Sequence, residues 1–69
     1  MKISARNVIP GTITAIKKGA TTAHVLFDVG GGTIITSSIT NESVDELGLV
    51  VGKKVYGVVK SSDVMIGIE

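Results

Sequence analysis

Three short segments of the chain bring together small hydroxyl side chains and isolated cations. They are residues 4–7, 40–43 and 60–62, and they read Ser-Ala-Arg-Asn, Thr-Asn-Glu-Ser and Lys-Ser-Ser. Hydroxyls and unpaired backbone N–H groups donate hydrogen bonds, and Arg and Lys add positive charge, so these residues could bind an anion. The same residue types are also ordinary in helix caps and turns, and on the residues alone that structural interpretation is the more common one.

Most other chemistry is excluded by what the chain lacks. It has no cysteine and only one histidine, His24, so it offers no thiolate nucleophile, no zinc-thiolate site and no common catalytic triad. His24 lies on the opposite face of its predicted strand from Val25 and Phe27, which indicates a solvated side chain. We therefore expect a protein that is not an enzyme and that holds no bare metal cation.

The glycine-rich motifs do not predict a nucleotide site. Gly30-Gly31-Gly32 fits neither G-x-G-x-x-G nor G-x-x-x-x-G-K-[ST], and Gly52-Lys53-Lys54 is not a Walker sequence. Because glycine adopts positive φ without steric cost, residues 30–32 are predicted to form a hairpin turn.

Strands dominate the secondary structure that the sequence predicts. Val, Ile and Thr account for 26 of the 69 residues, and β-branched residues favour strands. A short helix is predicted over 41–48, with Thr40, Asn41 or Ser43 as its N-cap and Gly48 as its stop. The predicted strands are 11–18, 22–29, 33–40, 53–60 and 64–68. Five strands with a helix between the third and fourth predict an all-β fold, an OB-like Greek-key barrel that forms one domain over residues 1–69.

A chain of this size has little core of its own. A domain of such length buries only about 60% of its unfolded surface, and this one has no disulfide. Val55 and Val59 share one parity of the strand 53–60 while Tyr56 and Val58 share the other, so both of its faces need apolar partners. We therefore expect a homo-oligomer. Because there is no apolar run of roughly 20 residues and no signal peptide, we expect a cytoplasmic protein without a membrane partner.

A series of motifs runs along the chain in a fixed order. It opens with Ser4-Ala5-Arg6-Asn7 and Gly11-Thr12-Ile13-Thr14. This order resembles the Mop domain of the molbindins, the small molybdenum-pterin-binding proteins, over nearly the whole chain. The later motifs that carry the resemblance are Lys17-Lys18-Gly19-Ala20, Gly30-Gly31-Gly32-Thr33, Ile39-Thr40-Asn41-Glu42-Ser43-Val44, Leu47-Gly48-Leu49, Gly52-Lys53, Val59-Lys60-Ser61-Ser62 and Val64-Met65-Ile66-Gly67.

The resemblance implies a protein that stores and buffers molybdate inside the cell. It implies that molybdate or tungstate is bound as the free oxyanion at the subunit interfaces of a hexamer, a trimer of dimers. No organic cofactor is firmly predicted, and the sequence leaves open whether a pterin is bound. Where this chain has Gly57, the family often has a small residue that is larger than glycine, so we expect local packing to differ there. The implied ligand groups are Ser4, Arg6, Lys60 and the backbone around Ala5 and Ser61 from one subunit, with Thr40 and Ser43 from its neighbour. The family also has a second class of oxyanion site, which we predict at the turn formed by Lys17, Lys18, Gly19 and Ala20.

The implied ligand fits the chemistry of these residues. Molybdate at neutral pH is a tetrahedral dianion whose oxygens only accept hydrogen bonds, so its site should supply donors and about two positive charges. Arg6 and Lys60 would provide that charge. Sulfate has the same charge and shape but is smaller, so the size of the cavity and the placement of its donors must reject it. Partly protonated phosphate instead brings an O–H group that finds no acceptor.

Two other functions compete with this interpretation. OB-fold nucleic-acid binders combine basic grooves with stacked aromatic rings, but this chain has a net charge of +1 and only Phe27 and Tyr56 as aromatics. We therefore expect no nucleic-acid partner. A purely structural oligomerisation module would share the fold, but it would leave Arg6 and Lys60 replaceable.

Overall fold

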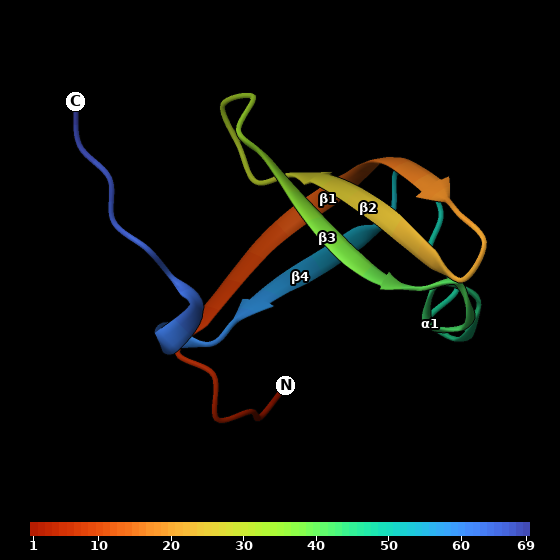
Figure 1. Cartoon of the computed structure of the whole chain (residues 1–69), viewed down its shortest axis with the longest axis horizontal. Coiled ribbons are helices and arrows are strands. Elements are labelled where there is room, and N and C mark those ends of the chain that lie inside the picture. Colours follow the sequence, from red (N-terminus) through yellow and green to blue (C-terminus); the bar gives the residue numbers. More distant parts are fainter.

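The chain forms one antiparallel sheet that curls over a small apolar core. The computed structural model describes residues 1–69, and its sheet has the strand order β3-β2-β1-β4 (Figure 1). The elements are β1 (Asn7–Lys18), β2 (Thr22–Asp28), β3 (Ile34–Thr40), α1 (Asn41–Glu46), β4 (Lys54–Val59) and the 3-10 helix η1 (Ser61–Asp63). A mostly-β fold with one short α-helix between the third and fourth strands is therefore confirmed.

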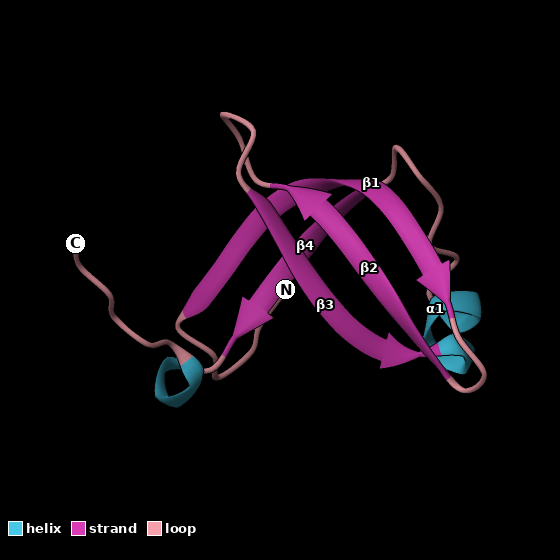
Figure 2. Cartoon of the chain, turned by 45° about the horizontal axis from the view of Figure 1, so that its top comes forward, coloured by secondary structure: helices cyan, strands magenta, loops and turns pink.

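β1 is the longest strand and joins the two halves of the sheet. It pairs with β4 through its first half and with β2 through its second half, and the two ladders meet at Thr12, opposite Lys54 and Asp28. The register shifts between Ile13 and Ala15. Such a bulge bends a strand and increases its twist, which explains why the sheet curls into a half-barrel (Figure 2).

β1 begins at Asn7 rather than at residue 11 as the sequence predicts. Pro10 argued against a strand over residues 7–10, because proline cannot donate to a strand ladder and normally marks the end of a strand. In the sheet, Pro10 lies opposite Tyr56 of β4, and the β1–β2 ladder only begins at Thr12. Residues 7–11 therefore have a strand on one side only, a position in which proline is tolerated.

The core is built mainly from the inward side chains of β1 and β2. The alternation predicted in β2 is confirmed, since its inward side chains are buried and His24 is exposed between them. α1 closes the core with one buried side chain. The buried residues are Ile13, Ala23, Val25, Phe27 and Val44.

Local signals place the helix and the main hairpin correctly. Thr40 is the N-cap of α1, because its Oγ1 accepts a hydrogen bond from the amide of Ser43 at 3.0 Å. The helix ends at Glu46, and Gly48 follows with a φ of +61°. Residues 30–32 all have positive φ and form the predicted turn between β2 and β3. Neither helix has the length and apolarity that crossing a membrane would require.

The predicted fifth strand, residues 64–68, is wrong for the isolated chain. After η1 the chain runs away from the sheet as a C-terminal arm, residues 64–69, and the side chains of Met65, Ile66 and Ile68 are 91%, 89% and 95% exposed (Figure 1). β3 and β4 are left as open edges, so a closed five-stranded Greek-key barrel is not confirmed. An isolated strand cannot satisfy its backbone groups, and η1 turns this one away from both edges.

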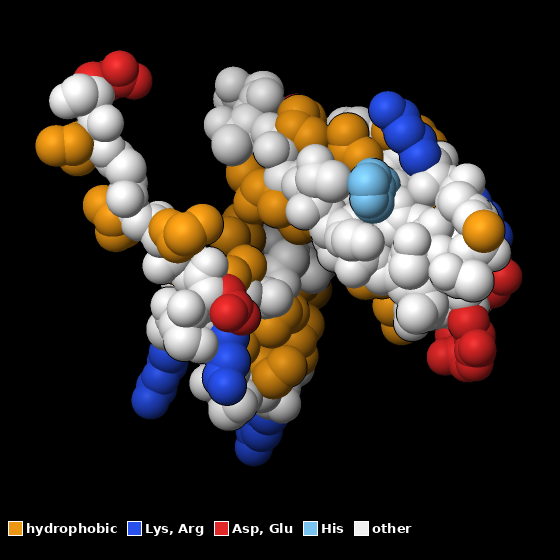
Figure 3. All heavy atoms as spheres, in the orientation of Figure 1, with side chains coloured by type: hydrophobic (Ala, Val, Ile, Leu, Met, Phe, Trp, Pro, Cys, Tyr) orange, Lys and Arg blue, Asp and Glu red, His pale blue; other side chains and the backbone are white.

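An apolar groove of about 290 Å³ lies where a fifth strand would close the barrel. Hydrophobic side chains line the hollow and continue along the arm (Figure 3). The groove is lined from both edges of the sheet, with Ile35 and Ile39 from β3 and Val55 and Val59 from β4.

Candidate functional site

Arg6 and Lys60 lie just beyond the last residue pair of the β1–β4 ladder. Asn7 is opposite Val59 at that end, so continuing the antiparallel register brings Arg6 opposite Lys60. Both side chains are exposed. Neither forms an ion pair, since the single salt bridge of the chain joins Lys18 to Asp45 beside α1. Like charges at facing positions of two strands repel each other. A bound dianion would offset this repulsion.

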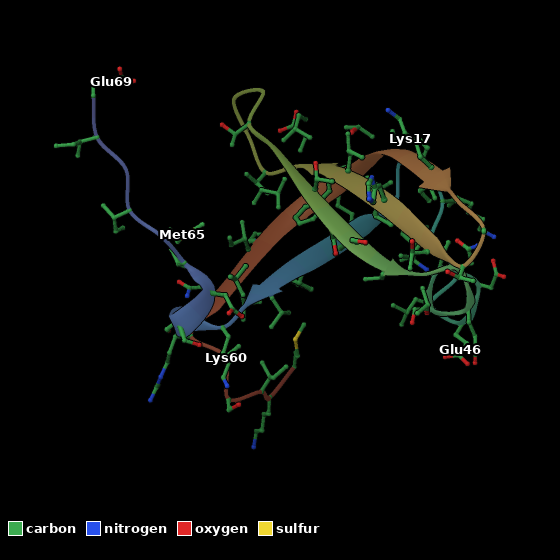
Figure 4. The ribbon with its side chains drawn as sticks, viewed as in Figure 1. Lys17, Glu46, Lys60, Met65 and Glu69 are labelled. Carbon is green, nitrogen blue, oxygen red and sulfur yellow. The ribbon has the colours of Figure 1, made fainter.

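Backbone donors lie at the same end of the sheet. η1 begins directly after Lys60 and is closed by a hydrogen bond from the amide of Asp63 to the carbonyl of Lys60 at 2.9 Å. The amides of Ala5 and Ser61 donate no hydrogen bond to the backbone. Ser61 is the first residue of η1, and the first N–H groups of a helix have no partner within the helix. Ser4 is exposed in the segment that leads to β1. Figure 4 shows Lys60 where this N-terminal segment passes η1. Five of the predicted groups thus come together here.

Thr40 and Ser43 form a separate hydroxyl pair at the start of α1. The Oγ1 atom of Thr40 hydrogen-bonds to the Oγ of Ser43 at 2.8 Å and accepts from the Ser43 amide at 3.0 Å. Since each hydroxyl carries one hydrogen and one is used within the pair, the pair retains one O–H for an external acceptor.

Several bonds hold α1, and with it this hydroxyl pair, against the sheet. Lys18 Nζ lies 2.7 Å from Asp45 Oδ1, and Lys53 Nζ donates to the carbonyls of Leu47 and Gly48 at 3.0 and 3.1 Å. Lys53 thereby caps the carboxyl end of the helix, and the helix dipole favours a cation there. The sequence analysis missed this role of Lys53. Its signal is a lysine shortly after a helix-terminating glycine.

The two parts of the predicted site lie at opposite ends of the sheet within one chain. Thr40 pairs with Thr22 at the start of β2, beside the end of β1, whereas Lys60 follows the residue that pairs with the start of β1. The twelve residues of β1 separate them, a contour of about 36 Å at the usual rise of a strand. Figure 4 shows the same separation between Lys60 and Glu46, the last residue of α1. One chain alone therefore does not gather the predicted residues around a single ion.

The turn predicted as a second oxyanion site has structural bonds of its own. Lys18 pairs with Asp45, the amide of Gly19 donates to the carbonyl of Thr22 at 2.7 Å, and the Gly19 carbonyl accepts from Asn41 Nδ2 at 3.0 Å. Ala20 is exposed at its tip. An anion here would compete with Asp45 for Lys18, so this second site stays a prediction.

Comparisons with known proteins assign the family. The TOBE domain matches residues 3–66. "Molybdenum-pterin-binding protein 2" of Clostridium pasteurianum is 50% identical over 66 residues, which cover 96% of this chain and 97% of that protein.

Two solved structures share the fold over the whole chain. A molybdate-binding protein from Sporomusa ovata has a TM-score of 0.92 and 38% identity, and the match covers 99% of this chain and all of that one. The cytoplasmic molybdate-binding protein ModG, solved with molybdate bound, has a TM-score of 0.94 and 43% identity, and this chain spans 49% of its length. The chain therefore belongs to the TOBE domain family and, within it, to the small molybdenum-pterin-binding proteins, the molbindins.

Proposed function

We propose that this protein binds molybdate, and also tungstate, as the free oxyanion between copies of the chain, and so stores the ion inside the cell. A single domain over residues 1–69 performs this function without catalysis. The observation that carries the proposal is the pair Arg6 and Lys60, two exposed cations on adjoining segments without a carboxylate partner. The names of relatives similar over nearly their whole length support the same ligand.

The donor set matches a tetrahedral dianion. Arg6 and Lys60 supply positive charge, and the amides of Ala5 and Ser61 supply neutral N–H donors beside them. Hydrogen bonds that involve a charged partner are about twice as strong as neutral ones. Such a site favours a fully deprotonated anion, since its two cations and its N–H groups can only donate and a protonated phosphate would bring one more donor. Selection of molybdate over sulfate then rests on the size of the cavity that the assembly fixes.

A second copy completes the site. Ser4, Arg6 and Lys60, with the backbone at Ala5 and Ser61, bind the ion from one copy, while Thr40 and Ser43 contribute the remaining hydroxyl donor from its neighbour. The separation of the two groups along β1 supports this division.

The C-terminal arm supports assembly of several copies. The side chains of Met65, Ile66 and Ile68 are almost fully exposed, and the groove between β3 and β4 is apolar and borders two open strand edges. Burying apolar surface contributes about 25 cal/mol per Å², so the arm of one copy gains most by filling the groove of another. We propose a hexamer, a trimer of dimers, as the assembled form.

The alternatives receive less support. Phe27 is buried, so Tyr56 is the single exposed aromatic ring on which a base could stack, and OB-fold nucleic-acid binders normally use several. A structural oligomerisation module would require the arm and the groove but would give no role to the unpaired cations.

Titration calorimetry tests the ligand. We expect saturable binding of molybdate, competition by tungstate and little competition by equimolar sulfate. Equal affinity for sulfate would contradict selection by size, and the absence of any binding of molybdate or tungstate would overturn the proposal.

A further inference from the structure

We propose that Asn7 is a positioning residue that sets the direction of Lys60 in the oxyanion site; this inference rests on the function proposed above. The Nδ2 atom of Asn7 donates a hydrogen bond to the carbonyl of Val59 at 3.2 Å, across 52 positions of the sequence, and the bond is partly buried.

The bond acts on the peptide unit that leads into Lys60. The carbonyl of Val59 and the amide of Lys60 belong to one planar group, so holding that carbonyl also fixes where the chain leaves β4. On the other strand, Asn7 directly follows Arg6. Asn7 therefore links the segment that carries Arg6 to the segment that carries Lys60.

No hydrogen bond joins the two segments beyond the Asn7–Val59 pair. The ladder stops at the Asn7–Val59 pair, and the amides of Ala5 and Ser61 are not used in backbone hydrogen bonds. The side-chain bond of Asn7 and the Asn7–Val59 ladder pair are thus the outermost interactions recorded between the two segments, and the side-chain bond is the one that a substitution can remove.

The two cations need such a tie because they repel each other. Facing like charges favour separation of the strand ends, whereas an anion can be shared only if both cations stay close to it. At metal sites, removing a residue that orients a ligand typically lowers affinity by about 10–100-fold, and by analogy we expect the lower end of that range for Asn7.

A double-mutant cycle with Lys60 tests this role. We expect Asn7→Ala to weaken molybdate binding by about tenfold in the wild-type background but by less than about twofold when Lys60→Ala is already present, because a residue that acts through Lys60 has nothing left to position. Asn7→Leu, which keeps most of the volume but lacks the donor, should match Asn7→Ala and covers the case in which the smaller side chain impairs folding.

Thr14→Val is the matched control. Thr14 Oγ1 also donates to a backbone carbonyl across the sheet, that of Leu26 at 3.3 Å, but it lies outside the site, so molybdate affinity should not change. A tenfold loss from Asn7→Ala in both backgrounds, or the same loss from Thr14→Val, would show a general structural effect and overturn the inference. Unchanged affinity in both Asn7 variants, with Arg6→Ala still impaired, would overturn it alone. Failure of the wild-type protein to bind molybdate would overturn the proposed function as well.

Discussion

The ring of Phe27 lies directly on the backbone of Gly57. A Cβ atom at Gly57 would sit 2.6 Å from Cζ of Phe27, and one at Gly11 would sit 2.8 Å from Cδ2 of the same ring. Gly57 belongs to β4 and Gly11 to β1, so the two strands make room for the aromatic side chain of β2 by having no side chains there. This contact accounts for a glycine at position 57.

Gly57→Ala should therefore destabilise the fold. The new methyl group must displace Phe27, and overpacking a core typically costs about 1–3 kcal/mol. Chemical denaturation at one fixed protein concentration measures the change in the free energy of unfolding. Adding Phe27→Leu to Gly57→Ala should recover part of the loss, with a coupling energy of at least about 0.5 kcal/mol. Strictly additive losses would show that the two residues do not interact as the contact requires.

Arg6→Ala should weaken molybdate binding by roughly ten- to a hundredfold, because a charge-assisted hydrogen bond contributes about 1.5–3 kcal/mol. The fold and the subunit mass should be retained, since Arg6 is exposed and makes no salt bridge. Lys54→Ala is the control, because it removes an exposed cation from the other end of β4. Calorimetry and sedimentation on the same variants separate the outcomes: unchanged affinity would mean that the ion binds elsewhere, and dissociation would indicate an intersubunit salt bridge.

Thr40→Val and Ser43→Ala should differ in their effect on stability. Thr40 caps α1, so its loss should cost about 1 kcal/mol of stability as well as binding affinity. Ser43→Ala removes a hydroxyl but leaves the amide that the cap accepts from, so it should weaken binding with little change in stability. Thermal unfolding with and without molybdate distinguishes the two effects. A Ser43→Ala protein with wild-type affinity would remove this residue from the site.

Ile66→Asp should shift the protein toward smaller species. Ile66 is 89% exposed in the isolated chain, so the change costs nothing there, whereas a charge placed in the apolar groove of a second copy would be strongly unfavourable. Glu69→Gln is the control at the end of the same arm. Analytical ultracentrifugation measures the result, and an unchanged assembly in Ile66→Asp would exclude the groove as the place where the arm binds.

Most of the fold could be predicted from local sequence signals. The alternation around Val25 predicted β2, the glycines at 30–32 predicted its turn, and Gly48 predicted the helix stop. The extension of β1 through Pro10 could not be predicted, because it depends on which edge of the strand is free. Residues 64–68 have the composition of a strand, but a strand also needs a partner, and in the single chain these residues pair with neither open edge of the sheet.

The sequence identified the chemistry of the site better than its location. Arg6 and Lys60 are far apart in the chain, and only the register of β1 with β4 brings them to one end of the sheet. Thr40 and Ser43 share the same hydroxyl chemistry, yet the fold puts them at the other end. The hydrogen bond of Asn7 depends on a tertiary contact that has no local signal in the sequence.

Native mass spectrometry with and without molybdate is the most direct test of the central claim, that the ion is bound between copies of the chain. We predict a hexamer that takes up molybdate, and we predict that the Arg6→Ala hexamer takes up less. A monomer that binds one molybdate ion per chain would contradict the claim, because Arg6 and Ser43 of one chain cannot reach the same ion.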